Sequence, residues 1–356
     1  MTIVAHSRPY VIGVDCHART HTYVIIDTST GQQQGCQQFP TTPAGIARAI
    51  AWAGRGTGGD ADTLWVIEGV ASYGAGLARA VTNAGYQVVE APRMNARARH
   101  GIGKSDPLDA HTIAATVLSL DETQLRTPRQ DQGTRAALRT LVAARDQLSH
   151  ERTMNINALT ALLRVNDLGI DARKPLNAVQ MSTVTRWRER DEPLEAGIAR
   201  EEAIRLARRI QELNQQLAAN LKRMTGLIQT SPAAPVLHIT GVGPVTAAVV
   251  LTAWSHPGRV RSEAAFAALA GVSPIPASSG NTTRHRLNRG GDRRLNQALH
   301  TAVLVRMIHD PETRAYVENR LQEGRSRREI RRALKRYLAR SIYRSLNALH
   351  QPVLTT

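Results

Sequence analysis

The order of strand and helix signals in residues 1–120 constrains the fold of this chain more than any other feature. Short runs of β-branched and apolar residues alternate with segments of helical periodicity. The predicted strands cover residues 11–15, 22–27, 32–39, 64–67 and 86–90. The predicted helices cover residues 43–52, 73–84 and 107–118. The turn sequence Thr-Ser-Thr-Gly joins the second and third strands as a hairpin. The segment is therefore predicted to form a mixed α/β sheet domain.

Three strands followed by alternating helices and strands is the order of an RNase H-like sheet, in which the first and fourth strands are neighbours. Asp15 ends the first strand and Glu68 ends the fourth, so the two carboxylates are expected to lie close together. Asp106 and Asp109 are three residues apart at the start of a helix and share one helical face. Four carboxylates in one place repel one another unless a hard divalent cation such as Mg²⁺ binds there. Two such ions about 4 Å apart would assist phosphodiester cleavage.

Each of these acids also has a plain structural explanation. Asp106 precedes Pro107 and could act only as a helix cap, and Asp109 could act only on the helix dipole. Asp15 and Glu68 are harder to explain in this way, because a carboxylate at the end of an apolar strand is unfavourable to bury without a partner. The four together favour a catalytic metal site.

The middle of the chain, residues 126–230, is predicted to be long-helical. Residues 134–165 carry an apolar stripe, and residues 167–193 are interrupted by glycine and prolines. In the next helix the apolar residues step by three or four: Ala203, Leu206, Ile210, Leu213, Leu217, Leu221, Met224 and Ile228. This spacing is typical of a coiled-coil seam that joins subunits, and an intramolecular helical hairpin explains it equally well.

The charge of the chain is unevenly distributed. The 46 Lys and Arg residues exceed the 29 Asp and Glu residues, for a net charge of +17. Residues 1–120 hold nine basic and eight acidic side chains, whereas residues 257–356 hold 19 basic and seven acidic ones. A near-neutral N-terminal part joined to a strongly basic remainder is typical of a nucleic-acid-binding protein. The C-terminal helix at 325–349 combines an apolar stripe with arginines such as Arg328 and Arg332, which could contact phosphates or RNA or simply form a solvated basic face.

Chain length, hydrophobic content and cysteine count limit which class of protein this chain can be. At about 150 residues per domain, 356 residues suggest two or three domains, and 42% hydrophobic residues suffice for real cores. Two cysteines form no disulfide framework, which fits a reducing cytoplasm, and neither a signal peptide nor a membrane span is expected. Cys16, His17 and His21 are not expected to bind zinc, because adjacent strand residues point to opposite faces.

Three N-terminal motifs carry a family resemblance. They are Val-Ile-Gly-Val-Asp at 11–15, Trp-Val-Ile-Glu-Gly at 65–69 and Gly-Lys-Ser-Asp-Pro-Leu-Asp-Ala at 103–110. Together they resemble the DEDD-type insertion-sequence transposases, which are bridge-RNA-guided recombinases with a RuvC-like catalytic domain and are related to pilin-gene invertases. Many members carry a lysine soon after the first aspartate, where this chain has Cys-His-Ala-Arg, so a nearby basic contact is in doubt.

The second half extends the resemblance. Residues 240–247 look like the hairpin of a helix-hairpin-helix element, with a tight turn between core helices as the alternative. Residues 270–296 resemble the C-terminal transposase domain, in which a serine directly before glycine is the nucleophile. That match implies Ser279 as the nucleophile, with Ser278 if the register differs by one. The match and the local charge give these nucleic-acid-binding candidates: Lys104, Arg284, Arg286, Arg289, Arg293, Arg294, Arg328 and Arg332.

The resemblance implies a four-part chain and a defined reaction. The expected parts are a RuvC-like domain (1–125), a coiled-coil region (126–230), a serine-bearing domain (231–320) and a basic C-terminal helix (321–356). The implied protein is a homo-oligomer, a dimer or tetramer, that acts on donor and target DNA with Mg²⁺ and a structured noncoding guide RNA. The implied chemistry is strand exchange through a serine–phosphodiester linkage, which conserves bond energy.

Three other functions remain open from the sequence. A metal-dependent, structure-specific nuclease would cut junctions without a serine adduct. A catalytically dead protein would bind nucleic acid without reacting. An actin-like ATPase would also suit Gly-Val-Asp at 13–15, although no later glycine-rich nucleotide loop follows and the basic tail is left unexplained.

Overall fold

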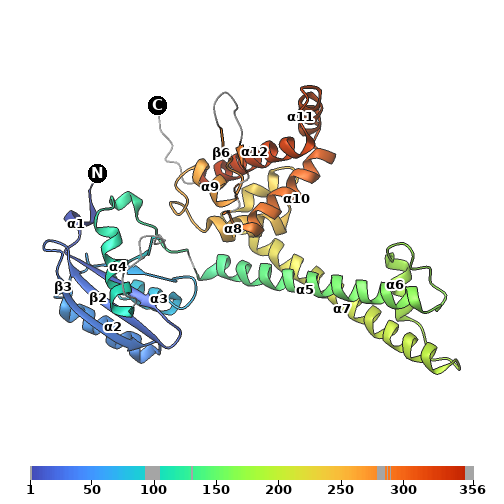
Figure 1. The fold of residues 1–356 in the computed structure, drawn as a ribbon, viewed down its shortest axis with the longest axis horizontal. Coiled ribbons are helices and arrows are strands. Elements are labelled where there is room, and N and C mark those ends of the chain that lie inside the picture. Colours follow the sequence, from blue (N-terminus) through green and yellow to red (C-terminus); the bar gives the residue numbers. More distant parts are fainter. Residues whose placement is uncertain are drawn as a thin grey trace. The chain divides into compact units, whose positions relative to one another are not determined.

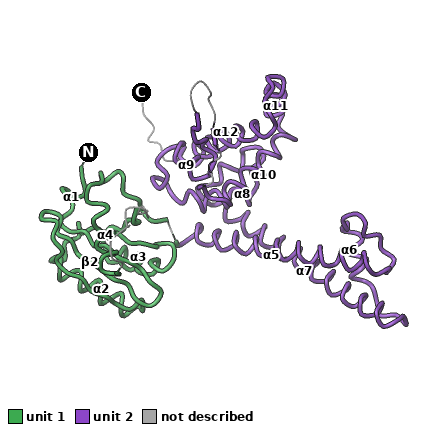
Figure 2. Tube along the Cα trace, in the orientation of Figure 1, with its two compact units in different colours: residues 1–131 green, residues 132–356 purple. Residues whose placement is uncertain are grey.

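The computed structural model of the chain describes residues 2–92, 105–129, 131–278, 285–286, 288 and 290–348. It contains two compact units, residues 1–131 and residues 132–356, which are coloured separately in Figure 2. We call them unit 1 and unit 2 and describe each by itself.

Unit 1 is built on a five-stranded mixed sheet with the order β3-β2-β1-β4-β5. The strands are β1 (Tyr10–Cys16), β2 (Thr20–Asp27), β3 (Gln33–Pro40), β4 (Leu64–Ile67) and β5 (Gln87–Glu90). The first three strands are antiparallel, and β4 runs parallel to both β1 and β5. The predicted order of elements and the predicted adjacency of the first and fourth strands are both confirmed.

Helices cover both faces of this sheet (Figure 1). They are α1 (Val4–Ser7), α2 (Pro43–Gly56), α3 (Ala75–Asn83), α4 (Asp106–Leu118) and the short 3₁₀ helix η2 (Glu122–Gln124). Successive strand residues point to opposite faces, so Ile12 and Val14 of β1 enter one core with α2 and α3. Val11 enters the other core, against α4. Asp15 is in phase with Val11 and is therefore directed to the α4 face.

Unit 2 begins with a long helical hairpin. It consists of α5 (Gly133–Val165) and α7 (Leu194–Gln229), with α6 (Ala178–Thr185) between them in the chain. The amide nitrogen of Asn220 donates to the carbonyl of Leu141 at 3.0 Å, and Arg145 donates to the carbonyl of Leu217 at 3.1 Å. Most of the predicted stripe of α7 is buried inside the chain, although Leu221 is exposed. The intramolecular hairpin is thus present, and a coiled coil that joins subunits stays a prediction.

The rest of unit 2 is a helical domain around one core. Its helices are η3 (Ala234–His238), α8 (Pro244–Trp254), α9 (Glu263–Leu269), α10 (Arg293–His309), α11 (Pro311–Gln322) and α12 (Arg327–Asn347). A two-stranded ribbon joins β6 (Ile275–Pro276) to β7 (His285–Arg286). The predicted apolar stripe of the C-terminal helix is buried in this core: Ile330, Leu334, Leu338, Ile342 and Leu346. The same core includes residues from the base of the hairpin, such as Leu138 and Met224. The four-part division of the chain stays a prediction.

Gly241 lies in the turn before α8 and has a structural role there. Its φ is +85°, and an added Cβ would lie 2.5 Å from the carbonyl oxygen of Ala302 in α10. Packing alone therefore explains this glycine, and the helix-hairpin-helix interpretation stays a prediction. Among the helices that the structure describes, none combines the length and the apolar character needed to cross a bilayer.

Candidate functional site

An acidic cluster lies on the α4 face of unit 1. Asp15, near the end of β1, is only 5% exposed, and Asp106 and Asp109 occupy the first turn of α4. His17 Nε2 lies 3.0 Å from an oxygen of Asp15 and 3.5 Å from an oxygen of Asp106. One donor atom from each of Asp15, His17 and Asp106 lies within 4.8 Å of the other two. A buried strand end and a helix N-terminus thus bring together groups that are far apart in the sequence.

The electrostatics of this cluster favour a cation. Burial raises the pKa of Asp15; the neighbouring His17 lowers it in part, and the carboxylates of Asp109 and Asp106 raise it further. The raised pKa of Asp15 means that its ionised form is unfavourable there. A divalent cation would relieve both the desolvation and the repulsion.

The spacing of the donor atoms also fits a single ion. Ligands about 2.1 Å from an octahedral ion have neighbours about 3.0 Å apart. The separations of 3.0 and 3.5 Å from His17 to the two carboxylates are close to that value. The 3.0 Å separation is also the hydrogen bond between His17 and Asp15, so an ion bound here would take the place of that bond.

Glu68 lies at the same end of the sheet but stands apart from the three-residue cluster. Its backbone nitrogen donates to the carbonyl of Val14 at 3.1 Å, which continues the β1–β4 ladder, and its side chain is exposed. Burial raises the pKa of the Cys16 thiol, and the charges of Asp15 and Glu68 raise it further. Both carboxylates thus act on one thiol. Among the described residues, the group of donors within 4.8 Å of one another does not include Glu68 or Asp109.

His17 is the residue that the sequence analysis missed. The signal was present in the sequence, since residues two apart in a strand share a face. Asp15 and His17 are two apart, whereas Cys16 packs against the opposite core.

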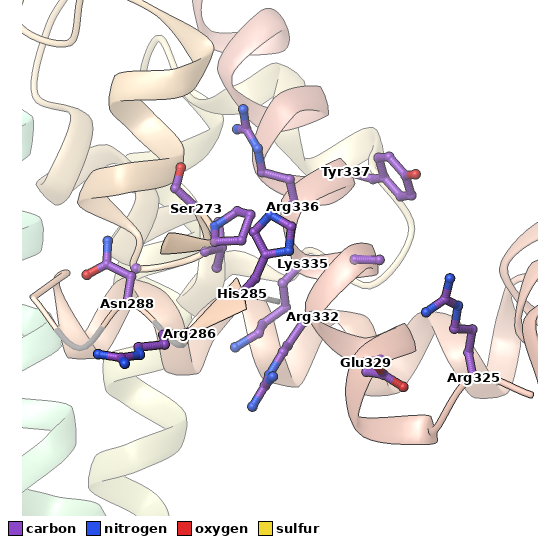
Figure 3. A pocket seen from close by; sticks show the side chains of 14 residues that line it. Ser273, His285, Arg286, Asn288, Arg325, Glu329, Arg332, Lys335, Arg336 and Tyr337 are labelled. Atoms are coloured by element: carbon purple, nitrogen blue, oxygen red, sulfur yellow. The ribbon is translucent and has the colours of Figure 1, made fainter. Parts of the chain in front are cut away.

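A basic pocket of about 630 Å³ lies in unit 2, between the β6–β7 ribbon and α12 (Figure 3). We call it the ribbon–α12 pocket. Two predicted nucleic-acid-binding residues, Arg286 and Arg332, line it. The other cations of its lining are Arg325, Lys335 and Arg336. Glu329 is the acid among these lining residues.

The Gly-Gly-Asp-Arg-Arg-Leu-Asn stretch at 290–296 builds the framework beside this pocket. An added Cβ on Gly291 would lie 2.3 Å from the backbone nitrogen of Gly271, so only glycine permits this close approach. Asp292 caps α10 by accepting from the backbone nitrogen of Leu295 at 3.0 Å. Asn296 donates to the carbonyl of Ala270 at 2.8 Å and accepts from Lys335 at 3.0 Å. Much of this motif therefore supports local packing.

The other predicted residues are distributed more widely. Arg294 forms an ion pair with Asp146 of α5 at 2.8 Å. Arg293 and Arg328 are exposed and do not line the ribbon–α12 pocket. Ser278 is exposed just after β6. Ser279, Lys104, Arg284 and Arg289 lie outside the described residues.

Comparison with known proteins assigns both halves of the chain to transposases. A model for IS110-type DEDD transposases, described as "Transposase", matches residues 12–165. A second model, "Transposase IS116/IS110/IS902 family", matches residues 233–318. The chain is also 30% identical over 123 residues to an uncharacterized 43.6 kDa protein of insertion element IS110 from Streptomyces coelicolor. That match covers 34% of this chain and 30% of the relative. With the two models in their expected order along the chain, this protein belongs to the IS110 family of DEDD transposases.

Proposed function

We propose that this protein is a DNA transposase that cuts and rejoins DNA strands at an insertion sequence. The observation that carries the proposal is the meeting of buried Asp15 with Asp106 and His17, in a chain whose two halves both match transposase families. A buried carboxylate with a second carboxylate beside it destabilises a fold, so the presence of Asp15 near Asp106 favours a functional role.

Asp15, Glu68, Asp106 and Asp109 would hold Mg²⁺, as two ions, with His17 as a further ligand. Mg²⁺ bound there would stabilise negative charge on the phosphate oxygens that react. The carboxylates themselves orient the site, and the burial of Asp15 between β1 and α4 limits its movement. Glu68 is exposed, so its side chain has room to turn toward the other carboxylates.

Ser279 would be the nucleophile of the reaction. Its Oγ attacks the phosphorus atom of a phosphodiester, and the bond from phosphorus to one bridging oxygen breaks. The proton of the hydroxyl passes to a base, and the departing oxygen gains a proton to become a hydroxyl. The serine–phosphate ester conserves the bond energy, so reversal by another DNA hydroxyl rejoins strands without ATP. Arg284, Arg286, Arg293 and Arg294 would hold the phosphate.

The partners of this reaction also belong to the proposal. Donor and target DNA would bind the strongly basic unit 2, with Arg289, Arg328 and Arg332 adding phosphate contacts there and Lys104 adding one from unit 1. The family resemblance supports a structured guide RNA that selects both DNA sites by base pairing. It supports a homo-oligomer as well, a dimer or a tetramer.

The test is a search for a covalent protein–DNA adduct on a denaturing gel. Purified protein receives the RNA transcribed from the flank of its own element, the cognate DNA and Mg²⁺. We expect an adduct with the wild type and with Ser278→Ala, and none with Ser279→Ala or Asp15→Ala. The melting temperature of each variant is first shown to be unchanged, so that a loss of the adduct reflects a lost chemical step and not unfolding.

The other outcomes separate the alternatives. An adduct lost in Ser278→Ala and kept in Ser279→Ala moves the nucleophile by one residue. Cleavage without an adduct in the wild type would sink the serine mechanism and leave a metal-dependent nuclease. Binding without any cleavage under Mg²⁺ or Mn²⁺ would indicate a protein that only binds nucleic acid.

A further inference from the structure

The cations of the ribbon–α12 pocket outnumber the acidic side chain among its described lining residues. Arg286, Arg325, Arg332, Lys335 and Arg336 line it, and within the described part of the chain none of them forms an ion pair. Glu329 offsets only part of this charge, since its single carboxylate interacts electrostatically with Arg325 and Arg332. That carboxylate also accepts from the backbone nitrogen and the hydroxyl of Ser326 at 2.9 and 2.8 Å. This capping box begins α12, and five cations beside one carboxylate among the described lining residues leave an excess of positive charge.

Neutral oxygens hold two of these cations in place. Lys335 donates to the side-chain oxygen of Asn296 at 3.0 Å, and Arg336 donates to the backbone carbonyl of Glu263 at 3.1 Å. Burial lowers the pKa of Lys335, and the neighbouring Arg332 and Arg331 lower it further. The positive charges are therefore fixed close together, and an anion would relieve their repulsion.

The pocket offers more than an anion site. Its volume of about 630 Å³ lies well within the range of pockets that enclose an organic molecule, about 300–1,000 Å³. Val272, Pro274 and Ala333 provide apolar lining, and His285 and Tyr337 provide rings. Tyr337 is 49% exposed although it sits on a helix whose apolar stripe is buried. A phosphate alone would leave these surfaces unused.

Two of the cations lie apart from the tyrosine ring of the pocket, whereas Arg325 lies on the same side as that ring (Figure 3). In Figure 3 the side chains of Arg332 and Lys335 extend to one side and the ring of Tyr337 lies at the other, with His285 between them. A nucleotide has the same two-part character, because it joins a phosphate to a flat, stackable base. Base stacking on an exposed aromatic ring tolerates any sequence.

We propose that the ribbon–α12 pocket binds one unpaired nucleotide of a nucleic-acid strand, with the phosphate at Arg332 and Lys335 and the base against Tyr337 and His285. The inference rests on the proposed nucleic-acid function and names the ligand of one site. A base inside a duplex is stacked on both faces and cannot enter a pocket. The site therefore selects single-stranded or locally opened segments over continuous duplex.

The experiment measures binding of the full-length protein to 12-nucleotide probes by fluorescence anisotropy. The probes are oligothymidylate, oligouridylate, a fully abasic DNA strand of equal charge, and a duplex. The variants are Tyr337→Leu and Arg332→Ala. Two controls are matched to them: Arg327→Ala removes the same charge from the same helix outside the pocket, and Tyr73→Leu removes an exposed tyrosine from unit 1.

We expect the wild type to bind the base-containing strands at least about fivefold more tightly than the abasic strand, the lower limit for stacking one base. Tyr337→Leu should remove most of that difference and leave abasic binding unchanged. Arg332→Ala should weaken both classes of strand and reduce the slope of log K against log salt by about 1. The controls should preserve the preference for bases. Comparison of the thymidylate and uridylate strands shows whether DNA or RNA fits the pocket better.

Several results would overturn the inference. One is that Tyr337→Leu weakens the binding of base-containing and abasic strands equally. Another is that neither Tyr337→Leu nor Arg332→Ala changes binding. A third is that the wild type binds the duplex as tightly as the single strands. If adduct formation depends on Ser279 while the base preference is absent, the inference fails and the proposed function stands. If no probe binds at low salt, both fail. Circular-dichroism melting of each variant excludes unfolding as the cause.

Discussion

Asp15 shows how one residue can be both buried and ionisable. The two-residue alternation of β1 directs it toward α4, where Asp106 and Asp109 begin the helix. Burial and like charges raise its pKa, so the native state binds more protons than the unfolded state between the two pKa values. The lower limit of that pH window is the pKa of an unfolded aspartate, about 4, and the upper limit is the raised pKa of Asp15 in the native state. By linkage, the free energy of unfolding falls as the pH rises through this window, and the full destabilisation is present at pH values above it.

We therefore predict that Asp15→Asn stabilises the protein at pH 7 without divalent ions. The expected gain in the free energy of unfolding is about 0.5–2 kcal/mol, typical of relieving a strained functional site, and it should shrink toward pH 4. Urea denaturation of both proteins from pH 4.5 to 8 measures it. Asp62→Asn, which removes an exposed carboxylate away from the cluster, should change stability little. A variant that is less stable than the wild type at pH 7 would contradict the prediction.

His17 leads to a second prediction, about the choice of metal. An imidazole nitrogen favours Mn²⁺ over Mg²⁺ more than a carboxylate does. His17→Gln should lower the affinity for Mn²⁺ by about tenfold or more, and the affinity for Mg²⁺ by a smaller factor. Calorimetric titration with each ion measures both, with His6→Gln in α1 as the control. Equal losses for the two ions would show that His17 is not a ligand.

Gly13 determines how closely α4 can approach β1. A Cβ at this position would lie 2.2 Å from the carbonyl oxygen of Ala110 and 2.6 Å from the nitrogen of Ala114. The Gly-Val-Asp sequence that would also suit a nucleotide-binding strand is thus explained by strand–helix packing. The same contact positions the first turn of α4 against Asp15.

Gly13→Ala should therefore weaken both the fold and the metal site. Overpacking of this kind lowers stability by about 1–3 kcal/mol or more, and displacement of α4 should weaken divalent-ion binding. Urea denaturation and ion titration test the two effects. Gly76→Ala is the matched control, because its Cβ would meet nothing nearer than Ile46 at 3.9 Å, in a helix where alanine is favoured. Similar stability changes at the two positions would contradict the packing argument.

At the scale of elements, hydrophobic periodicity predicted which helices exist and which of their faces are buried. It did not predict which helix each buried face packs against. The stripe on α12 was predicted and lies in the core of unit 2. The stripe on α7 was predicted too, yet its spacing fits a partner in another subunit as well as one in the same chain. The pairing with α5 depends on contacts such as Asn220 with Leu141, which are 79 residues apart.

The whole molecule contains two units, each with its own cores. We predict two unfolding transitions in calorimetry, because chains with separate cores depart from two-state behaviour. Asp15→Asn should shift only the transition of unit 1. Leu299→Ala, at a fully buried position of α10, should shift only the other, by the equivalent of about 2–5 kcal/mol. One transition that both variants shift together would contradict separate folding.

The sequence by itself determined the order of elements in unit 1, the shared helical face of Asp106 and Asp109, and the concentration of positive charge toward the C-terminus. These follow from local periodicity, helix geometry and composition, which need no knowledge of distant partners. Only the tertiary structure decided that His17 joins the acids, that Arg294 pairs with Asp146, and that Arg286 and Arg332 share one pocket with Lys335. Those outcomes depend on side-chain directions and on segments far apart in the chain, and neither is encoded in any short stretch of residues.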